Sequence, residues 1–358
     1  MRINAILLSG DSVPLASMVC KPFPKEIAPS RFTNVQIFGQ SIVGQMIERL
    51  RRHDIRVTLI KSPGGSKFVG DRETEISVAA NSREREMALA HAVNESAAGN
   101  SKTVLVSELS AYVEFDVTNA IQFHEARGQA VTPIRDSDGC IRSWLIDVAK
   151  WNSLRGSSQL LWERDFEGKR YEPFASRAYV NRLSNVFDLR KLVMDAFLGR
   201  CFIKPKEREF KPGVWMHESV RVDKSVRLVA PVYIGKNTAV GSGAIISRFT
   251  NIETGCRIGE GSVVSYASIL PHTRVGKGLD ISRAWVDGCE FTDLRRNVTL
   301  RVSDPNLITE ASLEKWHVLD LHPRPEKTRV RSWQPEVEYS QYLTRAAGRL
   351  FEAFKGEA

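Results

Sequence analysis

A six-residue repeat running from residue 213 to about 275 restricts the fold more than any other feature of this sequence. Starting at Met216, every sixth residue is apolar as far as Leu270, and a small or branched residue follows four places later. Beyond Leu270 the phase is expected to shift by one residue. The repeated apolar residues are Met216, Val222, Leu228, Ile234, Val240, Ile246, Ile252, Ile258, Val264 and Leu270, and the shifted series continues at Val275 and Ile281.

A repeat of this length predicts a parallel β-helix. Each unit forms one short strand and a turn, and stacking of the coils builds an interior column of aliphatic side chains. The small or branched residue fits near a corner where a larger side chain would clash. Glycine follows the aliphatic residue at Gly235, Gly241 and Gly259, and we interpret these as turn positions that need a positive φ. The β-helix is expected to span residues 214–305.

Residues 1–202 alternate between strand and helix patterns, which predicts βαβ units and a mostly parallel sheet. The helix expected at 41–52 places Ile42, Val43, Met46, Ile47 and Leu50 on one face. The other expected helices are 83–97 and 117–126, and the expected strands are 3–8, 57–60, 103–106 and 131–134.

Two further segments complete the expected organisation. Residues 203–213 are polar with two prolines and are interpreted as a linker. Residues 306–358 form a tail, in which apolar spacing over 337–354 predicts an amphipathic helix that docks on the protein or on a partner subunit. The chain is therefore predicted to be an α/β domain, a linker, a β-helix and a helical tail.

Charge and cysteine content narrow the possible partners. Fifty-one Lys and Arg against 42 Asp and Glu give a net charge of +9, which fits phosphorylated ligands or anionic surfaces as well as a solubilising surface charge. The densest basic cluster, at 324–331, lies outside any recognisable nucleic-acid module, so no nucleic-acid partner is expected. The five cysteines show no C-x-x-C spacing. A disulfide framework and a zinc site are not expected, and we expect a cytoplasmic protein without a membrane span.

The order of these parts, with "IERLRR" at 47–52, "FHEARG" at 123–128 and "DAFLGR" at 195–200, resembles the sugar-nucleotide pyrophosphorylases. The resemblance covers roughly residues 1–300. It implies a Rossmann-like nucleotidyltransferase domain followed by a left-handed β-helix of hexapeptide repeats. It also implies that the ligand is a sugar phosphate or nucleotide sugar, and that the chain forms a homo-oligomer or pairs with a partner subunit.

The nucleotide loop of that family is shortened in this chain. The family carries a G-G-x-G-T-R-L loop and a following K-P, because transfer to the α-phosphorus of a triphosphate needs backbone N–H groups, cations and Mg²⁺ around it. Here the strand ending at Gly10 is separated from Pro14 by only three residues, and Asp11 brings a negative charge. Lys21-Pro22 matches the K-P element, and Lys21 is either a phosphate contact or a surface lysine.

The two metal-binding aspartates of the family are also missing at the matched positions. One falls on Leu109-Ser110 and the other on Arg182, which cannot ligate Mg²⁺. Glu108 and Asp116 lie nearby as possible substitutes. We therefore assign no metal site and expect no cofactor, with Mg²⁺ needed only if the protein is an active transferase.

The resemblance and these departures from it predict a catalytically degenerate nucleotidyltransferase-like protein of polysaccharide biosynthesis, acting as a sugar-nucleotide-binding or regulatory subunit. Gly10, Lys21 and Arg182 are the candidate phosphate-binding residues, and Arg182 is expected to supply part of the charge of the missing cation. The alternative within the same family is an active sugar-1-phosphate nucleotidyltransferase with non-standard metal ligands.

A second alternative is acyl transfer by the β-helix, because hexapeptide acyltransferases use a histidine as general base. His217 lies at the first coil, and His272 follows the last regular aliphatic position. Both occupy turn positions, where exposed polar residues are common. Saturable binding of acetyl-CoA is the measurement that favours this alternative.

Overall fold

The computed structural model describes residues 3–8, 34–61, 74–79, 82–109, 111–136, 139–151, 171–176 and 178–311. All of them belong to one compact unit, Met1–Leu313. Gly10, Lys21 and the predicted C-terminal helix lie outside the described residues. Within the described part, no helix combines the length and apolar character needed to cross a membrane.

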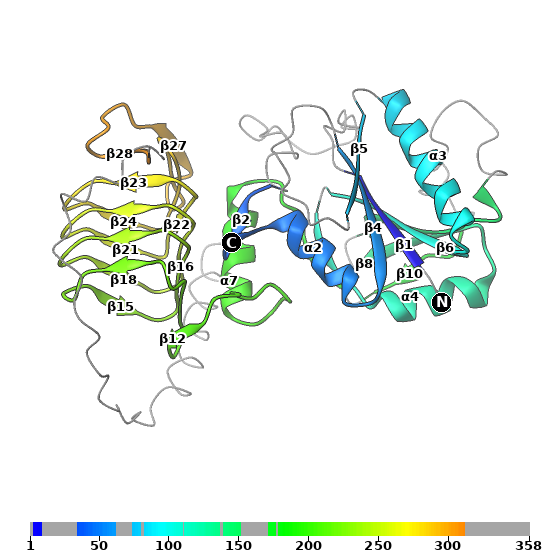
Figure 1. Ribbon diagram of the computed structural model, residues 1–358, viewed down its shortest axis with the longest axis horizontal. Coiled ribbons are helices and arrows are strands. Elements are labelled where there is room, and N and C mark those ends of the chain that lie inside the picture. The colour runs from blue at the N-terminus through cyan, green and yellow to red at the C-terminus, as the bar shows by residue number, and fades with distance from the viewer. Residues whose placement is uncertain are drawn as a thin grey trace. The chain divides into compact units, whose positions relative to one another are not determined.

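A seven-stranded sheet forms the centre of the N-terminal half (Figure 1). Its strand order is β10-β8-β9-β6-β1-β4-β5, and all strands are parallel except β9. Each of the four predicted strands is present. The bounds are β1 Ile3–Leu8, β4 Ile55–Lys61, β5 Glu75–Val78, β6 Thr103–Glu108, β8 Val131–Asp136, β9 Gly139–Asp147 and β10 Phe174–Ala175.

Helices cover both faces of this sheet, as the alternating pattern predicts. They are α2 Ile42–Arg51, α3 Ser82–Ala98 and α4 Val117–Arg127, and a fourth helix, α7 Val186–Phe197, packs against β11 Tyr179–Asn181. The predicted apolar face of α2 is buried, and the Ser41 hydroxyl caps the helix by accepting from the Gly44 N–H. Ala5 and Leu7 of β1 share a hydrophobic cluster with α2, α4 and α7. Ile6 and Leu8 pack instead in a second cluster with α3, because successive strand residues point to opposite faces.

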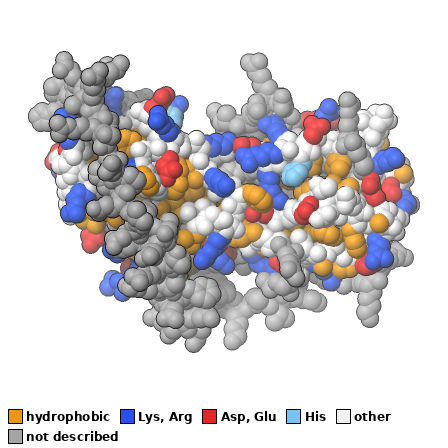
Figure 2. Space-filling model, turned by 90° about the horizontal axis from the view of Figure 1, so that it is seen from below, with side chains coloured by type: hydrophobic (Ala, Val, Ile, Leu, Met, Phe, Trp, Pro, Cys, Tyr) orange, Lys and Arg blue, Asp and Glu red, His pale blue; other side chains and the backbone are white. Residues whose placement is uncertain are grey.

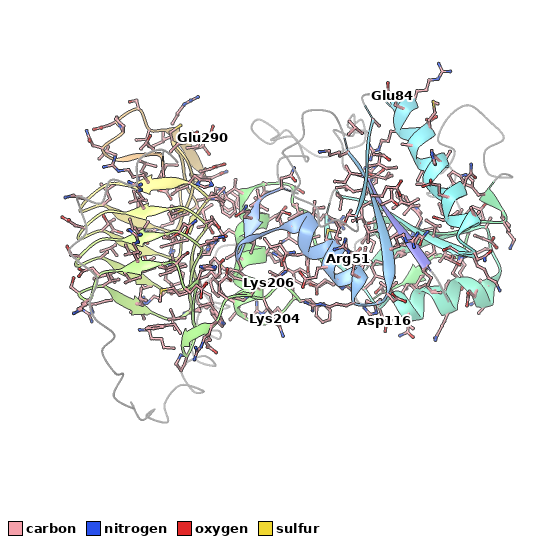
Figure 3. All side chains as sticks on the ribbon, in the orientation of Figure 1. Arg51, Glu84, Asp116, Lys204, Lys206 and Glu290 are labelled. Atoms are coloured by element: carbon pink, nitrogen blue, oxygen red, sulfur yellow. The ribbon has the colours of Figure 1, made fainter. Side chains whose placement is uncertain are left out.

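Three short antiparallel pairings lie outside the main sheet, the last of them at the first coil of the C-terminal half. They are β2 Gln36–Ile37 with β3 Gln40–Ser41, β7 Tyr112–Glu114 with β11 Tyr179–Asn181, and β12 Glu209–Lys211 with β13 Val214–Met216. The segment interpreted as a linker thus contains strand β12. Lys206 of this segment, labelled in Figure 3, is ion-paired with Glu48 of α2.

From Val214 to Asp287 the chain forms what we call the coil stack, in which three parallel sheets are built from successive coils (Figure 1). The chain forms β13, β14 Arg221–Val222 and β15 Arg227–Val229 in turn. The next strand, β16 Val232–Ile234, then pairs in parallel with β13. The first sheet contains β13, β16 Val232–Ile234, β19 Thr250–Ile252, β22 Ser268–Ile269 and β25 Ala284–Asp287. The second contains β14 Arg221–Val222, β17 Ala239–Val240, β20 Arg257–Ile258 and β23 Thr273–Val275. The third contains β15 Arg227–Val229, β18 Ile245–Ser247, β21 Val263–Ser265 and β24 Asp280–Ser282.

Antiparallel strands cover two of these sheets at the end of the stack. β26 Glu290–Asp293 pairs with β25, β27 Val298–Arg301 pairs with β26, and β28 Ile308–Glu310 pairs with β23. The parallel ladder therefore ends in strands of opposite direction.

The apolar residues of the six-residue repeat form the interior column of the stack, but the predicted position of the phase shift is wrong. Val240, Ile246, Ile252, Ile258 and Val264 are fully buried in one hydrophobic cluster. The next member of the column is Ile269, which pairs with Ile252, whereas Leu270 packs in a different cluster. The phase shift therefore occurs before Leu270. The coil is shortened by one residue between Val264 and Ile269, and Val275 and Ile281 continue the column at 17-residue spacing.

The reason given for the glycines of the repeat is wrong. Gly235, Gly241 and Gly259 do not have a positive φ. A Cβ atom at Gly259 would lie 2.3 Å from the backbone oxygen of Gly276 in the next coil. Corresponding atoms at Gly235 and Gly241 would lie 2.9 Å and 2.8 Å from backbone atoms of Glu253 and Glu260. These glycines are needed because adjacent coils approach too closely for a side chain. The positive-φ glycines of the stack are Gly243, Gly255, Gly261 and Gly278.

A buried carboxylate links the N-terminal half to the coil stack. Glu253 is fully buried, and its carboxylate accepts hydrogen bonds from the backbone N–H groups of Phe38 (3.0 Å) and Gly39 (2.9 Å). A third bond comes from the Asn251 side-chain amide at 2.8 Å. Burial raises the pKa of Glu253 to about 7, although these three donors oppose the shift.

A buried guanidinium makes a second link. Arg190 of α7 is 5 % exposed and donates to Ser268 Oγ (2.9 Å), to Asn251 Oδ1 (3.3 Å) and to the Phe249 carbonyl. Burial lowers the pKa of Arg190 to about 9, so the group is still charged at pH 7. Asn251 bonds both Arg190 and Glu253 and so joins the two links into one network.

Candidate functional site

The carboxyl edge of the N-terminal sheet is the candidate ligand-binding site. In the sheet, β1 pairs with β4 on one side and with the later strand β6 on the other, so the strand order reverses at β1. In open parallel sheets, ligands bind outside the carboxyl ends of the strands at such a reversal of strand order. Leu8 and Glu108, the last residues of β1 and β6, are paired in register at this edge.

Glu108 is held by an arginine rather than left open. Its side chain is 10 % exposed, and its Oε2 lies 2.6 Å from Nε of Arg142 in β9. Arg142 has φ +51°, a conformation that L-residues adopt rarely. The register between β8 and β9 shifts between Pro133 and Arg135, close to this position. Such an irregularity re-aims side chains at the rim of a sheet.

A second acid–arginine pair involves the last residue of β8. Asp136 Oδ2 lies 3.7 Å from Arg182 Nη2, with the aspartate side chain 8 % exposed and the arginine side chain 47 % exposed. Arg182 follows β11, in the loop that leads to α7. Because a guanidinium has five N–H donors, the exposed part of Arg182 retains donors for an anion. Arg182 is one of the predicted phosphate-binding residues, whereas its partner Asp136 carries no signal in the sequence.

The described residues do not fit the metal site of the pyrophosphorylases. At the first matched position Leu109 is buried and donates its N–H to the Leu8 carbonyl. The second matched position is the cation Arg182. Glu108 is paired with Arg142, and Asp116, labelled in Figure 3, caps α4 through the Asn119 N–H. No group of three or more His, Cys, Asp or Glu side chains suited to a metal ion occurs among the described residues.

Both segments that carry the resemblance also have structural roles. In 123–128, His124 is buried with Nδ1 2.7 Å from Thr132 Oγ1, and Gly128 ends α4 in a left-handed conformation. Burial lowers the pKa of His124, so its ring is neutral at pH 7. In 195–200, the buried Asp195 accepts a 2.8 Å hydrogen bond from the Tyr179 hydroxyl and pairs with Arg200. These residues position the chain around the sheet.

The two histidines of the acyltransfer alternative are far apart. His217 Nδ1 lies 2.9 Å from Ser219 Oγ, and His272 adopts φ +57° above Gly255 of the preceding coil. Three coil steps separate them, or about 14 Å at the spacing of neighbouring strands. Among the described residues, no carboxylate pairs with either ring to orient it as a base.

Sequence reasoning missed the residues whose partners are distant in the chain. The Arg142–Glu108 pair and the Arg190–Asn251–Glu253 network join residues from different elements. Their only sequence signal is a charged residue inside an otherwise apolar pattern, as at Arg190 between Leu189 and Leu192.

Comparison with known proteins adds little. No family model and no curated protein matches this sequence. Among solved structures, the crystal structure of HddC from Yersinia pseudotuberculosis is similar at 11% identity and a TM-score of 0.38, covering 53% of this chain and 97% of that chain. A likeness at this TM-score carries no argument about fold or function.

Proposed function

We propose that this protein is a degenerate relative of the sugar-nucleotide pyrophosphorylases that binds a sugar phosphate or nucleotide sugar without transferring a nucleotide. In this proposal residues 1–202 are the nucleotidyltransferase-like domain, and the coil stack is a left-handed β-helix of hexapeptide repeats. The protein acts as a binding or regulatory subunit in polysaccharide biosynthesis, as a homo-oligomer or with a partner subunit.

The observation that carries this proposal is the pairing of acids with arginines at the carboxyl edge. Glu108 is held by Arg142 and Asp136 by Arg182, so the carboxylates of this edge are neutralised by guanidinium groups. A phosphate is bound well by a planar guanidinium, which donates two parallel hydrogen bonds. This supports recognition of an anionic ligand with arginine in place of a metal ion. Gly10 and Lys21 complete the proposed phosphate site.

Calorimetric titration tests this proposal. Glucose 1-phosphate and UDP-glucose are titrated into wild type, Arg182→Ala and Arg127→Ala, with Mg²⁺ and with EDTA. Arg127 is a matched control because it is also a half-exposed, ion-paired arginine, but it lies at the end of α4, before the amino end of β8. We expect Arg182→Ala to weaken binding about tenfold or more, since it removes a charge-assisted hydrogen bond. Arg127→Ala and EDTA should leave the affinity unchanged.

Three results contradict the proposal. If neither ligand binds, or if Arg182→Ala binds like wild type, the edge is not the phosphate site. If pyrophosphate is released from a nucleoside triphosphate and a sugar 1-phosphate in a Mg²⁺-dependent way, the protein is instead an active nucleotidyltransferase with non-standard ligands.

A further inference from the structure

The third sheet of the coil stack carries a groove on its outer face. The groove has a volume of about 540 Å³ and is open to solvent. Four exposed arginines line it: Arg227, Arg248, Arg283 and Arg295. It belongs to a different half of the chain from the carboxyl edge described above.

A ladder of serine hydroxyls forms the floor of the groove. Ser247, Ser265 and Ser282 occupy the same place in three consecutive coils, because β18 pairs with β21 and β21 with β24 in register. Neighbouring strands lie about 4.8 Å apart, so the ladder is about 10 Å long. The Ser265 and Ser282 hydroxyls are 3.2 Å apart. The floor therefore carries a repeated hydroxyl along the stacking axis, which is exposed at Ser282, partly exposed at Ser265 and buried at Ser247.

Arg248 and Arg283 are placed at the corner beside this ladder, whereas Arg227 belongs to β15 and Arg295 follows β26. Arg248 and Arg283 stand two coil steps apart, with Tyr266 between them, and all three adopt a left-handed conformation. None of the four arginines has a carboxylate within 4 Å among the described residues. Figure 2 shows that Lys and Arg side chains on the face it presents are dispersed among other residues, so four arginines around one groove are a local concentration of charge.

These features distinguish between classes of anionic ligand. A small-molecule site encloses most of its ligand, which an open groove does not. Single-stranded nucleic acid binds through bases stacked on exposed aromatic rings. Tyr266 is the one aromatic residue among the described residues that line the groove, and its ring already contacts Phe249 (centroids 6.1 Å apart) and the Arg283 guanidinium (5.9 Å from its centroid). A sugar chain with acidic groups matches both the hydroxyl ladder and the arginines.

We propose that this groove binds an acidic oligosaccharide laid along the stacking axis, with its anionic groups on the arginines and its hydroxyls on the serine ladder. The inference rests on the groove alone and does not depend on the function proposed for the N-terminal half. In this proposal the coil stack binds a ligand separate from the one proposed for the N-terminal half.

Binding to immobilised full-length protein tests the proposal, with hexagalacturonate and a heparin hexasaccharide as acidic probes. Maltohexaose serves as the uncharged probe and a dT12 oligonucleotide as the nucleic-acid probe. The variant is Arg248→Asn with Arg283→Asn, because asparagine tolerates the left-handed conformation of these corners. The control is Arg274→Asn, an exposed arginine of β23 in the second sheet.

We expect saturable binding of at least one acidic hexasaccharide, weakened at least tenfold in the double variant and unchanged in the control. Binding should weaken as salt is raised, and maltohexaose should not compete. The proposal is overturned if neither acidic hexasaccharide binds, if the double variant binds as well as wild type, or if dT12 binds more tightly than both. Unchanged glucose 1-phosphate binding in the double variant separates this result from that for the carboxyl edge.

Discussion

Glu253 makes the stability of this protein depend on pH in an unusual direction. Its side chain is fully buried, and burial raises the pKa from 4.5 to about 7. The folded state therefore holds this proton more tightly than the unfolded state does. Between pH 4.5 and 7 the unfolded chain binds fewer protons at this residue, so the contribution of Glu253 to the free energy of unfolding falls as pH rises.

The size of the effect follows from the shift. One pKa unit corresponds to 1.36 kcal/mol, so the full difference amounts to about 3 kcal/mol, of which about 2.5 kcal/mol is lost between pH 5 and pH 8. In Glu253→Gln the group does not titrate and this component disappears. The amide also loses one hydrogen bond to Phe38 or Gly39, which lowers stability equally at every pH and leaves the slope unaffected.

Urea unfolding at pH 5, 6, 7 and 8 measures this difference. The matched control is Glu260→Gln, which alters an exposed glutamate of the same stack that pairs with Lys277. Wild type and the control should lose about 2.5 kcal/mol more than Glu253→Gln between pH 5 and pH 8. Parallel pH profiles for wild type and Glu253→Gln would refute the reasoning, since they would mean that the carboxylate stays ionised down to its ordinary pKa.

The other predictions concern the same junction and the coils. Arg190→Met removes the donor of three buried acceptors and should lower the free energy of unfolding by about 3 kcal/mol. The control, Lys191→Met on the exposed side of α7, should have little effect. Equal urea midpoints for the two variants would show that the network adds no stability. Gly259→Ala should cost about 3 kcal/mol because its Cβ meets the Gly276 oxygen. Gly261→Ala, which has open space but φ +66°, should cost about 1 kcal/mol; the reverse order of melting temperatures would contradict the close-approach explanation.

Local patterns predicted the helices and strands of this fold well, because helix and strand formation depends on residues that are neighbours in the chain. The apolar face of α2 and the column from Val240 to Val264 follow directly from their spacing. The shortened coil was misplaced because Ile269 and Leu270 are both aliphatic, and only the pairing of Ile269 with Ile252 shows which one enters the column.

The candidate sites were harder to predict because their geometry joins distant residues. Glu253 bonds Phe38 across 215 positions, and no periodicity encodes such a contact. Arg182 was found by its mismatch to a family motif, but its pairing with Asp136 depends on how the loop after β11 returns to the end of β8. The four arginines of the groove come from separate elements of the chain and follow no sequence motif.

The antiparallel strands β26 and β28 set the length of the coil stack. A parallel ladder ends in unpaired N–H and C=O groups that invite another strand, and these two strands occupy that edge on two of the three sheets. A coil inserted upstream of them would leave the same terminal pairing intact. Adding one 18-residue unit between Asn237 and Ile246 should therefore move the terminal strands outward by about 4.8 Å. The same insertion would shift Glu253 and Asn251 by one coil from Phe38 and Arg190, so the junction with the N-terminal half limits where a coil can be added.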